Sequence, residues 1–109
     1  MLIKEIKVPS QYAGIVYVDP DFKGETQWLI AERGCVDLTG TFDATVSSYK
    51  VQTGGNQVAR CSFYDAYGCG GSLIIITPAD GLEVPLLEGA KDNKARSYRC
   101  SLYPLMQEG

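Results

Sequence analysis

The sequence writes one phrase twice: residues 43–51 read DATVSSYKV, and residues 92–100 read DNKARSYRC. The two phrases match at a constant offset of 49 residues. The matched pairs are Asp43 with Asp92, Val46 with Ala95, Ser48 with Ser97, Tyr49 with Tyr98 and Lys50 with Arg99. A second similarity lies upstream, where YVDPDFKG at 17–24 aligns with YDAYGCGG at 64–71. The chain therefore contains two related units, at about 13–57 and about 58–103.

Short runs of β-branched and aromatic residues, bounded by Gly, Pro, Asp or Asn, predict strands along the whole chain. These runs are 2–8, 13–19, 26–31, 47–53, 58–65, 72–77 and 97–103. In GLEVPLLEGA, at 81–90, a proline stands between two glycines, so we expect an extended edge strand or an irregular loop there. Four strands in each unit suit a Greek key. The sequence thus predicts an all-β, two-sheet sandwich of two Greek-key motifs.

The core of such a sandwich comes from the inward residues of both sheets. The apolar residues that we expect to point inward are Ile15, Trp28, Ile30, Val51, Phe63, Ile74, Ile76 and Leu102. A chain of 109 residues suits a single domain, here residues 1–109, with a core of useful size.

The charge pattern limits the classes of partner that we expect. The chain has 13 acidic and 10 basic residues, no histidine and a net charge of −3, without a long run of either sign. This balance argues against a nucleic-acid or membrane partner, and we expect a monomer or weak self-association. Charged residues interrupt the apolar stretch at 2–8, so no signal peptide is predicted for the chain as written. Four cysteines in a short chain are also compatible with an oxidising compartment. Localisation therefore stays undecided between cytoplasm and secretion.

These units resemble the βγ-crystallin superfamily, over residues 13 to 103. The unit of that family opens with a hairpin ending in aromatic-x-Gly, which Tyr17, Phe22 and Gly24 match in unit one. It closes with a serine at the start of the fourth strand, matched by Ser48 and Ser97. In unit two, a cysteine at 69 replaces the hairpin aromatic, and we expect it to have a local structural role.

Four residues have a structural role on this resemblance. A hairpin that folds over its own sheet needs a residue that takes positive φ, which explains Gly24 and Gly71. The resemblance implies that the hydroxyls of Ser48 and Ser97 form hydrogen bonds to these hairpins. Without histidine, neither these serines nor the cysteines have their usual general base.

The resemblance also implies a calcium signature, which reads Asn/Asp, Asn/Asp, x, x, Ser/Thr, Ser. Each phrase has one defect: Ala44 replaces the second residue in unit one, and Arg96 replaces the fifth in unit two. In the family, as the resemblance implies, the fifth-position hydroxyl of one unit works with the second-position oxygen of the other. Ser47 and Asn93 then complete one calcium site, with the backbone carbonyl of Thr45 as a further ligand, while Ala44 and Arg96 disable the second.

A purely structural role for the repeated aspartates competes with calcium binding. An aspartate side chain caps the backbone two residues on, so Asp43 and Asp92 are also ordinary turn starters. On this alternative the protein binds no calcium at physiological concentration. If the calcium signature is functional, the protein binds a single calcium ion weakly.

Four cysteines allow three disulfide pairings, and a structural zinc is disfavoured because the chain has neither CxxC spacing nor histidine. If the third strand of unit one joins the sheet of unit two, as the resemblance implies, all four cysteines lie in or beside one sheet. We then favour Cys61 with Cys69 and Cys35 with Cys100. Free buried thiols are the alternative and suit a cytoplasmic protein.

Two main hypotheses for function follow. The first is a non-enzymatic structural or stress protein that binds calcium weakly, and the second is a secreted small toxin, effector or hydrolase inhibitor on the same fold. An enzyme is disfavoured, because the spacing of the carboxylates selects no catalytic pair. Those carboxylates are Glu25, Glu32, Asp37, Asp80, Glu83 and Glu88.

Overall fold

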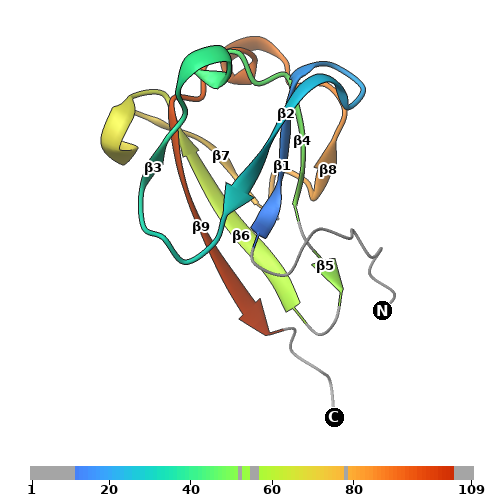
Figure 1. Cartoon of the computed structure of the whole chain (residues 1–109), viewed down its shortest axis with the longest axis vertical. Helices are drawn as coiled ribbons and strands as arrows, with labels where there is room; N and C mark the ends of the chain where they lie inside the picture. Colours follow the sequence, from blue (N-terminus) through green and yellow to red (C-terminus); the bar gives the residue numbers. More distant parts are fainter. Residues whose placement is uncertain (1–11, 52, 55–56, 78, 105–109) are drawn as a thin grey trace.

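The protein is an all-β sandwich of two antiparallel sheets (Figure 1). The structure is a computed structural model that describes residues 12–51, 53–54, 57–77 and 79–104. The strands are β1 (Tyr12–Asp19), β2 (Lys23–Ile30), β3 (Val36–Asp37), β4 (Ser48–Val51), β5 (Thr53–Gly54), β6 (Gln57–Tyr64), β7 (Leu73–Ile76), β8 (Glu83–Val84) and β9 (Ser97–Pro104). Three short 3₁₀ helices connect them: η1 (Gly40–Phe42), η2 (Tyr67–Cys69) and η3 (Gly89–Lys91). The strand predicted at 2–8 lies outside the described residues.

The two units exchange one strand each. One sheet has the order β2-β1-β4-β8, and the other has the order β3-β9-β6-β5, with β7 also paired to β6. Thus β8 of unit two completes the sheet of unit one, and β3 of unit one joins the sheet of unit two. This exchange brings η1 and η3 to the same end of the molecule, as Figure 1 shows.

Two buried tyrosines from the repeated phrases lie in the core. The rings of Tyr49 and Tyr98 flank Phe63, with ring centroids 5.9 and 6.0 Å from the Phe63 centroid. Each hydroxyl has a backbone partner: Tyr49 donates to the Gly81 carbonyl, and Tyr98 accepts from the N–H of Ile30. Burial raises the pKa of both phenols, so both stay neutral at physiological pH.

The predicted core is correct for Val51 and Phe63, which are fully buried, and Ile74 and Leu102 pack against the core while partly exposed. It is wrong for four strand residues. Ile15 and Ile30 are only partly buried, and Trp28 and Ile76 are 39% and 44% exposed. Their neighbours point inward instead; these are Val16, Leu29 and Ile75. Because these strands carry apolar residues on both faces, their sequence does not determine which face is buried.

Both hairpins fold over their sheets through equivalent contacts. Gly24 and Gly71 have φ of 79° and 64°, and a Cβ at either position would collide with the side chain of Asp19 or Asp65. In unit one, Ser48 Oγ accepts from the N–H of Phe22 at 3.1 Å and donates to the Asp19 carbonyl at 2.7 Å.

In unit two, Ser97 Oγ accepts from the N–H of Cys69 at 2.9 Å and donates to the Ala66 carbonyl at 2.6 Å. Each serine is fully buried. A single hydroxyl thus closes each hairpin onto the fourth strand of its own unit.

The disulfides are Cys35–Cys69 and Cys61–Cys100, with Cα–Cα distances of 5.9 and 4.1 Å. The predicted pairing of Cys61 with Cys69 and of Cys35 with Cys100 is therefore wrong, and none of the four thiols is free. Cys61 and Cys100 lie directly opposite each other on β6 and β9. Cys69 instead ends η2, which lies beside β3, where the N–H of Gly68 donates to Asp37 at 2.8 Å.

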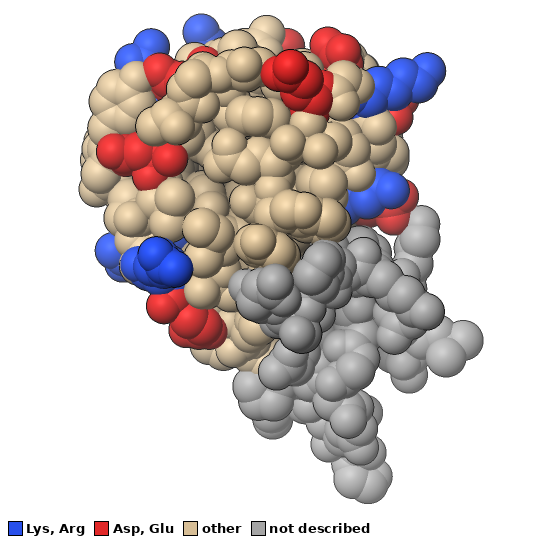
Figure 2. All heavy atoms as spheres, viewed as in Figure 1, with Lys and Arg blue, Asp and Glu red and all other residues tan. Residues whose placement is uncertain are grey.

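Charges of both signs are interspersed on the face of the molecule shown in Figure 2, and most of its middle is uncharged. No helix in the described ranges is long and apolar enough to cross a membrane.

Candidate cation sites

The two repeated phrases cross each other at one end of the sandwich. The N–H of Ala44 donates to the Ala95 carbonyl at 2.9 Å, and the N–H of Asn93 donates to the Val46 carbonyl at 3.1 Å. These two bonds are equivalent under the 49-residue offset. As a result, the second residue of each phrase lies beside the fifth residue of the other, and two related places are formed.

The first place gathers three side-chain oxygens. Ser47 Oγ lies 2.7 Å from Asp92 Oδ1 and 3.2 Å from Asn93 Oδ1. Ser47 is 5% exposed and is fixed by its backbone, because its N–H donates to the Tyr17 carbonyl and its carbonyl accepts from the N–H of Leu87. Hydroxyl, amide and carboxylate oxygens are the donors that calcium prefers. The residues of this place therefore fit calcium by their chemistry.

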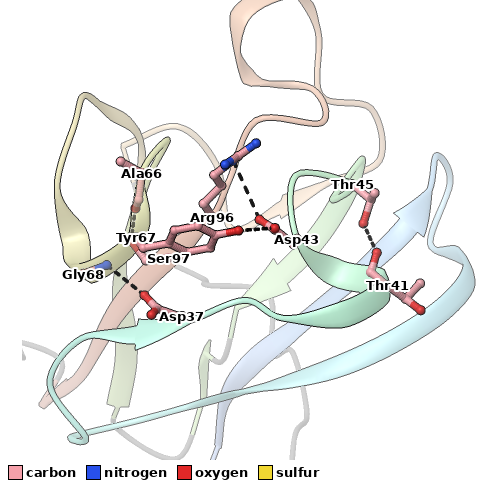
Figure 3. Close-up of polar contacts among 9 residues, drawn as sticks. All are labelled: Asp37, Thr41, Asp43, Thr45, Ala66, Tyr67, Gly68, Arg96 and Ser97. Carbon is pink, nitrogen blue, oxygen red and sulfur yellow. Dashed lines mark hydrogen bonds and ion pairs between the residues drawn. The ribbon is translucent and has the colours of Figure 1, made fainter.

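The second place holds a positive charge of the protein itself (Figure 3). Arg96 Nε lies 3.8 Å from Asp43 Oδ1, and the guanidinium carbon lies 5.4 Å from the centroid of the Tyr67 ring. The Tyr67 hydroxyl donates to the other carboxylate oxygen of Asp43. Arg96 thus interacts with a carboxylate and an aromatic face together, and both interactions favour a cation.

The residues of this second place do not fit a metal ion. Ala44 has no side-chain oxygen, and the guanidinium of Arg96 repels a divalent cation. Asp43 Oδ1 is buried and has no hydrogen-bond partner among the described residues, and Arg96 Nε lies 3.8 Å from it. The hydrogen bond to Asp43 raises the pKa of Tyr67, as do slight burial and the Asp43 charge.

The structure brings Ser47 and Asn93 together at the first place, as the crossed arrangement requires. Ala44 and Arg96 lie at the second place. Thr45 lies in the turn that starts at Asp43, and its hydroxyl donates to the Thr41 carbonyl. Its backbone carbonyl as a metal ligand stays a prediction.

Sequence reasoning missed two participants. Asp92 was expected to start a turn, yet its carboxylate also bonds Ser47; its place as the first residue of the signature was the available signal. The sequence carries no signal for Tyr67, because η2 meets Asp43 only through the strand exchange between the units. In the described part of the chain, no group of three or more Cys, Asp or Glu side chains is arranged to hold a metal.

Three of the scattered carboxylates are acceptors for the backbone. Asp37 accepts from the N–H of Gly68, Glu32 from that of Leu102, and Asp80 from that of Ile76. These contacts give the three side chains structural roles.

Comparison with solved structures identifies the fold. No protein-family model matches the chain, and no curated protein matches its sequence. The N-terminal domain of protein S superposes with a TM-score of 0.66 at 25% identity, covering 85% of this chain and all of that one. A βγ-crystallin domain from Flavobacterium johnsoniae gives 0.65 at 20% identity, covering 81% and 92%. The βγ-crystallin Hahellin gives 0.62 at 21% identity, covering 90% and 100%.

Proposed function

We propose, since this chain has the double Greek-key fold of the βγ-crystallins, that it is a non-enzymatic structural or stress protein that binds one calcium ion weakly. The observation that carries this proposal is the convergence of the Ser47, Asp92 and Asn93 oxygens at one place, while Arg96 fills the equivalent place. One site binds, and the other is occupied by a tethered cation.

Calcium affinity follows from the ligand charge. The Ser47 and Asn93 side chains are neutral, and Asp92 contributes the one carboxylate of the three. Calcium sites with few charged ligands are weak, so we expect a dissociation constant of about 10⁻⁴ M or weaker. When bound, the ion supplies a positive charge that connects the two phrases, as Arg96 does on the other side. At about a hundredfold excess over that constant, the stabilisation reaches about 2.7 kcal/mol.

Calorimetric titration with calcium tests the proposal directly. The parent protein should bind one ion per chain. Asn93→Gly removes the amide oxygen, and glycine adopts the φ of 58° at this position without strain, so this variant should lose binding. Ala44→Gly is the matched control, because it makes the same type of change at the equivalent position, with φ of 56°, and removes no ligand.

Two results contradict the proposal. One is a parent that binds no calcium at millimolar concentration, which leaves Asp92 as a turn starter only. The other is equal binding by Asn93→Gly and Ala44→Gly, which places the ion elsewhere.

A further inference from the structure

A surface cavity of about 330 Å³ lies beside β4, β8 and η3. Its floor is formed by Tyr49 and Ile75, which are 0% and 1% exposed. The remaining lining residues are apolar Val84, Leu86 and Leu87 and charged Asp80, Glu88 and Lys91. Pockets for small molecules typically measure about 300 to 1,000 Å³ and combine apolar walls with a few polar groups. The volume of this cavity lies at the lower end of that range, and its lining is part apolar and part charged.

The repeat shows what unit one has at the equivalent position. Lys91 ends η3, and Phe42 stands 49 residues earlier, at the end of η1. Phe42 packs against the hydrophobic core. Lys91 instead extends its ammonium group to Asp80, with Nζ 2.9 Å from Oδ1, and its side chain is 42% exposed. Unit two therefore lacks the aromatic ring that unit one places beside its own 3₁₀ helix.

The charges around the opening leave one negative group without compensation. Asp80 accepts from the N–H of Ile76 at 2.7 Å and pairs with Lys91, so these two side chains neutralise each other. Glu88 is exposed, and its side chain forms no ion pair or hydrogen bond within the described ranges. The opening thus carries a net negative charge at neutral pH, which favours a cationic ligand.

We propose that this cavity binds a small hydrophobic monocation, namely a primary ammonium compound with one aromatic or branched apolar group. The apolar group packs on Ile75, Val84 and Leu87, in the space that corresponds to the Phe42 ring of unit one. The ammonium group faces the Glu88 carboxylate. This site is separate from the place formed by Ser47, Asp92 and Asn93, and its ligand is organic.

Amide NMR titration with 2-phenylethylammonium, in buffer with a calcium chelator, tests this site. We expect saturable shifts at millimolar probe that centre on Leu86 to Lys91. Lys91→Phe supplies the side chain that unit one uses and should abolish these shifts. Lys94→Phe makes the same substitution at an exposed lysine outside the lining and should leave them unchanged.

The variant Glu88→Gln and two analogues of the probe, one uncharged and one anionic, test whether the cavity selects a positive charge. Since exposed ion pairs are weak, Glu88→Gln should weaken binding of the ammonium probe about three- to fivefold. It should not change the weaker binding of 2-phenylethanol, and 3-phenylpropanoate should bind least. Binding that survives Lys91→Phe, or equal binding of the three probes, or no shifts at millimolar ammonium probe, overturns the proposal.

Discussion

Ala44 and Asn93 occupy equivalent positions, and both have left-handed backbone conformations, with φ of 56° and 58°. Asparagine tolerates this conformation and offers a side-chain oxygen, whereas alanine has neither property. The same position therefore places a side-chain oxygen beside Ser47 in unit two and is strained in unit one. The choice between alanine and asparagine at this position therefore decides both the strain and the presence of a side-chain oxygen.

Replacing Ala44 with Asn should relieve that strain. We expect Ala44→Asn to raise the free energy of unfolding by about 1 kcal/mol, since the left-handed conformation costs roughly that much for ordinary residues. Urea unfolding in a calcium chelator measures the effect without a contribution from ion binding. A loss of stability would show that the alanine methyl group makes contacts worth more than the strain.

The hydrogen bond from Tyr67 to Asp43 should make the free energy of unfolding depend on pH. Its hydroxyl donates to Asp43, and this hydrogen bond, followed by slight burial and the Asp43 charge, raises the pKa of Tyr67 above its ordinary value. Donation needs the neutral phenol. The contribution to stability is therefore complete below about pH 10, the pKa of the unfolded chain, and is lost as pH rises through the higher pKa of the folded state.

Tyr67→Phe isolates this effect. The difference in free energy of unfolding between the parent and Tyr67→Phe should be constant from neutral pH to about pH 9 and should shrink above about pH 10. Chemical denaturation over this range measures it, and the subtraction removes the titration of the other tyrosines. A difference independent of pH would mean that the hydroxyl contributes nothing through Asp43.

At the scale of elements, the two folded hairpins depend on one buried serine each. Ser48 and Ser97 each join a backbone N–H to a carbonyl of the hairpin. Removal of either hydroxyl leaves both backbone groups without a partner. We expect Ser48→Ala and Ser97→Ala each to lower the free energy of unfolding by about 1 to 3 kcal/mol.

Ser101→Ala, a change of the same type in β9, provides the control for denaturant unfolding. Ser101 is only partly buried, so its substitution should have little effect. If all three variants unfold alike, the hairpins are held by contacts other than these hydroxyls.

The repeat predicted the Greek-key units and the two hairpins, because glycine and serine have position-specific roles in a folded hairpin. The inward face of β2 and β7 was not predictable in the same way. In LIII at 73–76, every residue is apolar, so alternation cannot distinguish Ile75 from Ile76. Trp28 is larger than its buried neighbour Leu29, yet it stacks outside on Tyr12, with ring centroids 5.5 Å apart. Size and hydrophobicity alone pointed to the wrong face.

At the scale of the whole molecule, the disulfides join parts that the sequence keeps apart. Cys35 precedes β3 of unit one, and Cys69 ends η2 of unit two, so this bond connects the two units. The family resemblance implied that all four cysteines lie in or beside one sheet, but it did not determine which of them face each other. That choice depends on the register of β6 with β9, in which Cys61 is directly opposite Cys100.

Peptide mapping without reductant should recover Cys35 linked to Cys69, and Cys61 linked to Cys100. The double change Cys35→Ser with Cys69→Ser should lower the free energy of unfolding by about 2 to 4 kcal/mol, mainly because the unfolded chain is less constrained. Denaturant unfolding under non-reducing conditions measures this loss. A Cys61–Cys69 peptide would contradict the register of β6 and β9.

We propose that the two phrases cross to form two equivalent cation sites, one open to calcium and one filled by Arg96. The most direct test is the number of calcium ions bound by the double variant Ala44→Asp with Arg96→Ser, measured by calorimetry beside the parent. This variant restores the missing oxygen and removes the guanidinium, so it should bind two ions where the parent binds one. A double variant that still binds one ion, or a parent that already binds two, would contradict the claim.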